Sequence, residues 1–210
     1  MKKKIVTLCL VAALAVTAIG GTLAYFTDKT QVTSNTFTVG NVNIELDEAD
    51  VDVYGVADGT NRTTNGNEYK LIPGHNYVKD PTVTVKSGSE ESYVRMIVTV
   101  NKVDALKEVM PEAVAADGVF LLQNFVNGWD STKWECTSAT AEGVYEFRYY
   151  TTVDARTADV VLEDLFTDFT LPADLSNDEV AKLDNLSIDV IAHAIQADGF
   201  ADANAAWAEF

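Results

Sequence analysis

Cysteine, histidine and positive charge are all scarce in this 210-residue sequence. It contains two cysteines, two histidines and 15 Lys and Arg residues against 32 Asp and Glu residues, for a formal net charge of −17. So acidic a chain argues against binding to nucleic acid or to anionic lipid, because both bind through Lys and Arg. The acidity is typical of a protein that stays soluble outside the cell. Loose Ca²⁺ binding and attraction to cationic partners stay open as alternatives.

The shortage of His and Cys also limits the chemistry available to a site. His75 and His193 lie far apart, and the sequence has no His-Glu-x-x-His motif, so only a dispersed zinc site remains open. Cys136 has no His near it in sequence, and no Gly-x-Ser-x-Gly elbow is present. We therefore predict no catalytic residues, no metal ligands and no cofactor. The remaining metal alternatives are zinc on the two histidines and Ca²⁺ on the acids Asp47, Glu48, Asp50 and Asp52.

The first 24 residues have the order of a secretory signal peptide. Lys2, Lys3 and Lys4 precede an apolar run over residues 5–19, and small residues follow it. Thr22 and Ala24 suit the −3 and −1 positions of a signal peptidase site, so Tyr25 is predicted to become the first mature residue. The apolar run of roughly 15 residues is shorter than the roughly 20 that a spanning helix needs. We therefore expect cleavage and no stable membrane insertion afterwards.

Cleavage would make the mature chain more acidic and leave it without a disulfide. It removes three of the 15 basic residues and none of the 32 acidic ones. It also removes Cys9, which leaves Cys136 with no partner in the chain. The fold must then hold without a disulfide, and Cys136 is predicted to be an inert or partly buried thiol.

Alternating apolar residues predict a mainly β domain. The clearest case is 93–100, where Val94, Met96, Val98 and Val100 share one face. Pro81 predicts that the strand at 77–85 is an edge strand or is broken in two. The acidic segment 47–52 and the Gly-rich segment 55–67 are predicted to form a long exposed loop. The predicted strands are 36–46 with a bulge at Gly40-Asn41, 77–85, 93–100, 119–125, 132–136, 145–151 and 186–197.

Short helices are predicted at three places. Asp104 can cap a helix that Pro111 ends, Ser176 and Glu179 form a capping box, and Asp202 can begin a terminal helix. The whole pattern favours an antiparallel, jelly-roll-like β-sandwich with a few short helices. We predict a single domain at 36–210, preceded by the mature N-terminal segment 25–35.

Two stretches carry a resemblance to a known family. Residues 20–28, Gly-Gly-Thr-Leu-Ala-Tyr-Phe-Thr-Asp, followed by Asn-Thr-Phe-Thr-Val-Gly-Asn-Val at 35–42, resemble exported proteins processed by a SipW-type signal peptidase. Ile72-Pro73-Gly74, leading into 80–85 and 93–100, is similar to the core of the TasA/camelysin family of biofilm matrix proteins. The segment 104–184 lies outside this resemblance.

The resemblance implies a secreted jelly-roll subunit that polymerises with itself into extracellular fibres. The N-terminal segment of one copy would be donated as a strand to the next, starting at Tyr25, Phe26 and Thr27. The implied partners are further copies of the chain, the signal peptidase during export, and an anchoring or accessory matrix protein. Two alternatives stay open: a camelysin-like cell-surface metallo-endopeptidase, and a surface adhesin that binds through the loop at 55–67.

Overall fold

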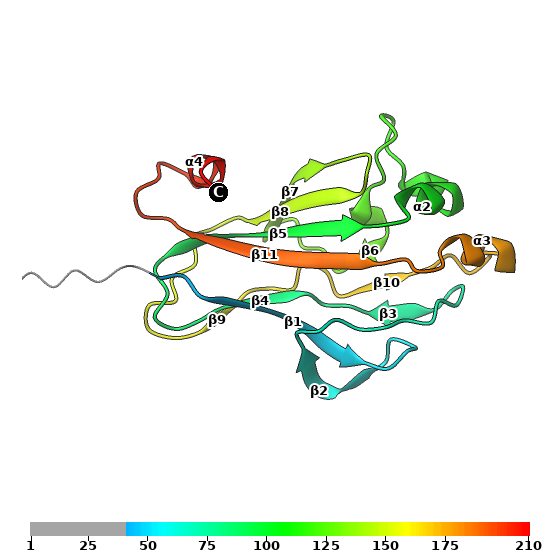
Figure 1. The fold of residues 1–210 in the computed structure, drawn as a ribbon, viewed down its shortest axis with the longest axis horizontal. Helices are drawn as coiled ribbons and strands as arrows, with labels where there is room; N and C mark the ends of the chain where they lie inside the picture. Colours follow the sequence, from blue (N-terminus) through cyan, green and yellow to red (C-terminus); the bar gives the residue numbers. More distant parts are fainter. Residues whose placement is uncertain (1–40) are drawn as a thin grey trace, which may run out of the picture. The chain divides into compact units, whose positions relative to one another are not determined.

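The fold described by the computed structural model, which covers residues 41–210, is mainly β (Figure 1). Those residues form eleven strands in three antiparallel sheets, with a few short helices. The predicted fold class is confirmed in these terms, while the jelly-roll arrangement stays a prediction. No helix within this described range is long and apolar enough to span a membrane.

The first sheet contains the clearest predicted strand. Val94, Met96, Val98 and Val100 are fully buried, as the alternation predicted, because they share the inner face of their strand. Tyr145 and Phe147 of the neighbouring strand are buried on the same side. We call this the β5 sheet. Its strand order is β11 (Ile188–Gln196), β5 (Ser92–Val100), β8 (Val144–Tyr149) and β7 (Trp134–Ala139).

The second sheet corrects the predicted loop. We call it the β1 sheet, and its order is β2 (Ala57–Thr63), β1 (Ile44–Val51), β4 (Thr82–Val85) and β9 (Val160–Val161). The prediction of a loop over 47–52 and 55–67 was wrong, since β1 runs on to Val51 and β2 occupies the Gly-rich segment. The segments 47–51 and 57–63 lack apolar alternation and depend on ladder pairing and on ion pairs, which sequence periodicity does not reveal.

The third sheet is small and explains the proline at position 81. Its order is β3 (Asn76–Val78), β10 (Asp168–Thr170) and β6 (Val126–Asn127). The predicted strand at 77–85 is indeed broken in two, with β3 in this sheet and β4 in the β1 sheet. β4 lies between β1 and β9, so it is not an edge strand.

The segment at 119–125 is not the strand that was predicted. It contains the 3-10 helix η2 (Leu122–Asn124), and Phe120 makes an isolated bridge to Val114. Phe120, Leu122 and Phe125 are nevertheless buried. An apolar run of this length fits an irregular core segment as well as a strand, so periodicity could not separate the two.

The helices follow their predicted caps with one exception. The capping box of Ser176 and Glu179 begins α3 (Asn177–Lys182), and the Asp202 side chain caps α4 (Ala203–Ala208). The exception is α2 (Val103–Val109), which starts after Lys102 in a left-handed conformation and has no side-chain cap, so Asp104 lies inside it. As predicted, α2 ends before Pro111, which opens the 3-10 helix η1 (Pro111–Ala113).

Candidate functional site

Among the described strands, β11 is an edge strand of the β5 sheet. Ala197 N donates to Glu91 O and Asn101 N donates to Ser187 O, so the odd-numbered residues of β11 bond to β5. The register between the two strands is unbroken from Ile188 to Gln196. In an antiparallel ladder the intervening residues point their N–H and C=O groups the other way. The outward-facing backbone groups belong to Ile188, Val190, Ala192 and Ala194.

Strand β1 has a similar open stretch. Lys86 N donates to Asn43 O, which places the odd-numbered residues of β1 in bonds to β4. The backbone groups of Ile44 and Leu46 therefore face away from β4. Pairing with β2 on that side begins only at Glu48. Within residues 41–210, the first half of β1 thus has an unpaired edge on the side that faces β11.

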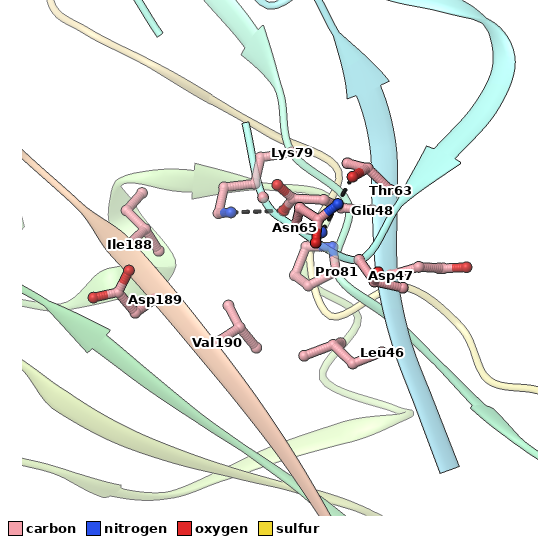
Figure 2. A pocket seen from close by; sticks show the side chains of 12 residues that line it. Leu46, Asp47, Glu48, Thr63, Asn65, Lys79, Pro81, Ile188, Asp189 and Val190 are labelled. Carbon is pink, nitrogen blue, oxygen red and sulfur yellow. Dashed lines mark hydrogen bonds and ion pairs between the residues drawn. The ribbon is translucent and has the colours of Figure 1, made fainter. Parts of the chain in front are cut away.

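A groove lies between these two edges (Figure 2). Figure 2 shows Leu46 of β1 and Val190 of β11 in the space between the strands. The cavity measures about 240 Å³. Thr63, Thr64, Asn65 and Gly66 close one end of it. The other lining residues are Leu46, Asp47, Glu48, Lys79, Pro81, Ile188, Asp189 and Val190.

A buried ion pair lies at the closed end of the groove. Lys79 Nζ is 2.6 Å from Glu48 Oε2, and the two side chains are only 9% and 7% exposed. Asn67 Nδ2 donates to the other carboxylate oxygen, Glu48 Oε1, at 2.8 Å. Burial and then the Glu48 charge raise the pKa of the neighbouring Tyr69. These polar groups hold the loop after β2 against β1.

Arg62 of β2 forms ion pairs and a hydrogen bond with residues of β1 and with residues in and next to β4. Its guanidinium lies 2.8 Å from Asp47 Oδ1 and 2.8 Å from Asp80 Oδ2, and it donates to Thr82 Oγ1 at 2.7 Å. Burial lowers the pKa of Arg62, but the hydrogen bonds to Asp80 and Asp47 outweigh this effect and raise it overall. This network explains why a polar, Gly-rich segment forms a strand.

Three of the four acids that could have bound Ca²⁺ have other partners, and the fourth, Asp50, is exposed. Asp47 pairs with Arg62, Glu48 pairs with Lys79, and Asp52 Oδ1 accepts hydrogen bonds from backbone N–H groups of the turn that follows it. In the described part of the chain, no group of three or more His, Cys, Asp or Glu side chains is placed to hold a metal ion.

The two histidines lie in different surroundings. His75 Nε2 is 2.6 Å from Tyr54 O, and its ring packs edge-on against Tyr77. His193 lies on the outer face of β11, where Arg95 Nε donates to its Nδ1 at 3.3 Å and Phe210 packs on its ring. Burial and then the Arg95 charge lower the pKa of His193. His193 is therefore a packed strand residue.

Cys136 is a partly buried thiol on β7. Burial raises its pKa, which makes the reactive thiolate less accessible. The partly buried position predicted for this thiol is confirmed, and its inertness stays a prediction.

The predicted site residues lie outside the described residues. They are the cleavage positions Thr22, Ala24 and Tyr25 and the donor positions Tyr25, Phe26 and Thr27. Sequence reasoning missed the groove. It predicted strands at both places but had no signal for which strand edges stay open, because the order of strands in a sheet is a tertiary property.

Comparison with known proteins bears on the N-terminal part of the chain. A family model described as camelysin metallo-endopeptidase matches residues 1–66. The match includes β1 and β2 and ends beside the groove. Comparisons with curated proteins and with solved structures gave no match. The family match over residues 1–66 confirms the resemblance to the TasA/camelysin family that the sequence motifs indicated.

Proposed function

We propose that this protein is a secreted structural subunit that polymerises into extracellular fibres. Residues 25–35 of one copy would insert as a strand between β1 and β11 of the next copy. The observation that carries the proposal is the pair of facing open edges, Ile44 and Leu46 on β1 and Ile188 to Ala194 on β11. A strand placed there would have backbone partners on both sides once β1 and β11 move apart, because parts of these two strands approach within 8 Å and two strands that flank a third lie roughly 10 Å apart.

The groove suits a strand whose side chains alternate. Leu46, Ile188 and Val190 provide apolar lining, so every second side chain of an inserted strand would be removed from water. The inserted backbone would gain hydrogen bonds from the outward groups of β11, which otherwise form an edge open to indiscriminate pairing. Affinity would come from the backbone bonds and specificity from the lined pockets.

Export would control when assembly starts. The signal peptide at 1–24 would direct secretion, and a SipW-type peptidase would cut after Ala24. Cleavage would free the segment that begins Tyr25-Phe26-Thr27 for insertion. Fibres would then form outside the cell, where an anchoring or accessory protein could hold them.

The test uses two complementary defects. A mature chain without residues 25–35 cannot donate a strand but keeps its groove. The Ala192→Pro variant keeps the segment, while its proline removes an outward N–H of β11 and no bond to β5. Each protein alone should remain a folded monomer by circular dichroism and light scattering. Their mixture should give one-to-one dimers, since one partner supplies the strand and the other the groove.

The control substitutes a residue of the same strand that faces away from the groove. Ile191 is 58% exposed on the outer face of β11, so Ile191→Lys should leave assembly unchanged. Negative-stain electron microscopy should show filaments for the mature protein and for this control. Filaments from the protein without residues 25–35 would refute strand donation.

The family description supports a second candidate, a metallo-endopeptidase. A dispersed zinc site that used His75 or His193 would make proteolysis depend on zinc. The measurement is hydrolysis of an unfolded protein substrate with zinc and with a chelator, for the wild type and for the His75→Gln and His193→Gln variants. Chelator-sensitive activity that either substitution abolishes would favour the peptidase over the structural subunit.

A further inference from the structure

Lys79, Glu48 and Asn67 form a hydrogen-bonded triad that the proposed assembly does not use, with Lys79 and Glu48 buried and Asn67 half-buried. One carboxylate bridges the amine and the amide: Lys79 Nζ donates to Glu48 Oε2 at 2.6 Å, and Asn67 Nδ2 donates to Glu48 Oε1 at 2.8 Å. Lys79 and Glu48 are 7% and 5% exposed. A nucleophile, an electrophile and a proton carrier are thus held together away from most of the solvent.

We propose that this triad forms an intramolecular isopeptide bond between Lys79 Nζ and Asn67 Cγ, with Glu48 as the catalytic residue. The bond would tie the loop after β2 to the segment between β3 and β4. It is a covalent modification within one chain, and its formation does not depend on strand donation.

The Asn67 amide is held in one orientation by three hydrogen bonds. Its Nδ2 donates to both Glu48 Oε1 and Ala49 O, and its Oδ1 accepts a hydrogen bond from Val51 N at 3.1 Å. These three bonds fix which end of the amide is nitrogen. The Val51 N–H lies where negative charge develops on Oδ1 during addition, so it supplies the type of donor found in an oxyanion hole.

Glu48 can carry the protons that the reaction needs. It first takes one proton from the Lys79 ammonium, which leaves a neutral amine and a neutral acid. Because both nitrogens bond to the same carboxyl group, it can accept a proton at Nζ and deliver one at Nδ2 without a further group.

The chemistry balances without any oxidant or cofactor. The Nζ lone pair adds to Asn67 Cγ to form the new C–N bond, and the C=O electron pair moves to Oδ1. A proton passes from Nζ through Glu48 to Nδ2. The carbonyl re-forms, the Cγ–Nδ2 bond breaks and ammonia leaves. The ammonia takes the remaining proton from Glu48 as ammonium, and the carboxylate is restored.

Trypsin digestion of the purified wild-type protein with mass spectrometry tests the bond directly. Without it, trypsin cuts after Lys70 and Lys79 and releases peptides 63–70 and 71–79. An acylated Lys79 is not a cleavage site, so the expected product is a branched peptide in which 63–70 is joined to 71–86. Its mass should be lower than the summed masses of peptides 63–70 and 71–86 by the mass of one ammonia molecule.

Matched variants assign the roles. Lys79→Arg keeps the positive charge without the amine nucleophile, and Glu48→Gln keeps the shape without the proton carrier, so both should lose the branched peptide completely. Glu45→Gln changes an exposed acid of the same strand, one that pairs with Lys86, and should keep it. Ordinary peptides 63–70 and 71–79 from folded wild-type protein would overturn the proposal. A branched peptide that persists in Glu48→Gln would overturn the role of Glu48.

Discussion

The β5 sheet and the β1 sheet are stabilised by different means. In the β5 sheet, aliphatic and aromatic side chains fill the inner face, from Val94 and Met96 on β5 to Phe147 on β8. The β1 sheet has buried Val83 and Val85 as well, but its buried Glu48 pairs with Lys79 from the segment between β3 and β4, and its Arg62 guanidinium lies between two aspartates. Apolar burial dominates one sheet, and paired charges are needed in the other.

Because of this difference, we expect the loss of a side chain to lower the free energy of unfolding by different mechanisms in the two sheets. Apolar contacts are non-directional, so losing one side chain costs its burial and leaves a cavity. A buried ion pair depends on both partners, since removing one leaves an uncompensated charge. The four predictions below test this contrast, from the largest expected effect to the smallest.

The largest effect is expected from Phe147→Ala in the β5 sheet. Phe147 is 2% exposed and packs against Trp129, so its removal leaves a cavity in the core. Unfolding in urea should show a loss of about 4 kcal/mol in the free energy of unfolding. The control Ile191→Ala, on an exposed position of the same sheet, should change it by about 0.5 kcal/mol or less. Equal losses would show that the inner face is not the stabilising one.

Glu48→Ala in the β1 sheet should cost about 3 kcal/mol, because it leaves the Lys79 ammonium buried without its partner. The variant also lacks the proton carrier of the proposed cross-link, and losing that bond would lower stability further. The same urea titration measures the loss. Glu45→Ala removes the exposed pair with Lys86 and should cost about 0.5 kcal/mol or less. If Glu48→Ala lost no more free energy of unfolding than Glu45→Ala, the buried charges would contribute little to stability.

Phe210→Ala tests how much the contact between the Arg95 guanidinium and an aromatic ring stabilises the outer face of the β5 sheet. The Arg95 guanidinium lies 4.3 Å from the centre of the Trp207 ring and 4.8 Å from that of Phe210. Removing one of these aromatic faces should cost about 1 kcal/mol in thermal or urea unfolding. Glu209→Ala, at the neighbouring exposed position, is the control. Unchanged stability of Phe210→Ala would show that the C-terminal residue does not hold Arg95.

The smallest effect is the pH dependence due to His193. Burial and the Arg95 charge lower its folded-state pKa below the usual 6.5, so the unfolded chain takes up a proton first as the pH falls. The contribution of His193 to stability is therefore complete above about pH 6.5 and decreases towards the lowered pKa. For His193→Gln, the free energy of unfolding should decrease less than that of the wild type between pH 7.5 and pH 5.5. A decline identical to that of the wild type would exclude this titration.

The sequence predicted the elements whose cause is local. The alternation at 93–100 produced β5, and the capping residues Ser176 and Asp202 produced α3 and α4. It failed at β2, whose residues are stabilised by Arg62 bonds to Asp47 and Asp80, 15 and 18 positions away in the chain. Local pattern carries no information about such pairs, and a Gly-rich polar segment is more often a loop.

The candidate sites divide in the same way. The signal peptide and the donor segment at 25–35 are predictions from charge, apolar length and small residues along the chain, and both stay predictions because they lie outside the described residues. The groove could not be predicted, since it depends on which edges of β1 and β11 remain unpaired. The triad could not be predicted either, because Lys79 and Asn67 lie 31 and 19 positions from Glu48.

The sequence by itself determined a mainly β chain, since side-chain periodicity and composition act over a few neighbouring residues. The tertiary structure alone decided the order of strands, the two open edges and the burial of Glu48 with Lys79. These features arise only when segments distant in sequence pack together, and the free energy of burying a charge depends on the partner that the fold brings to it.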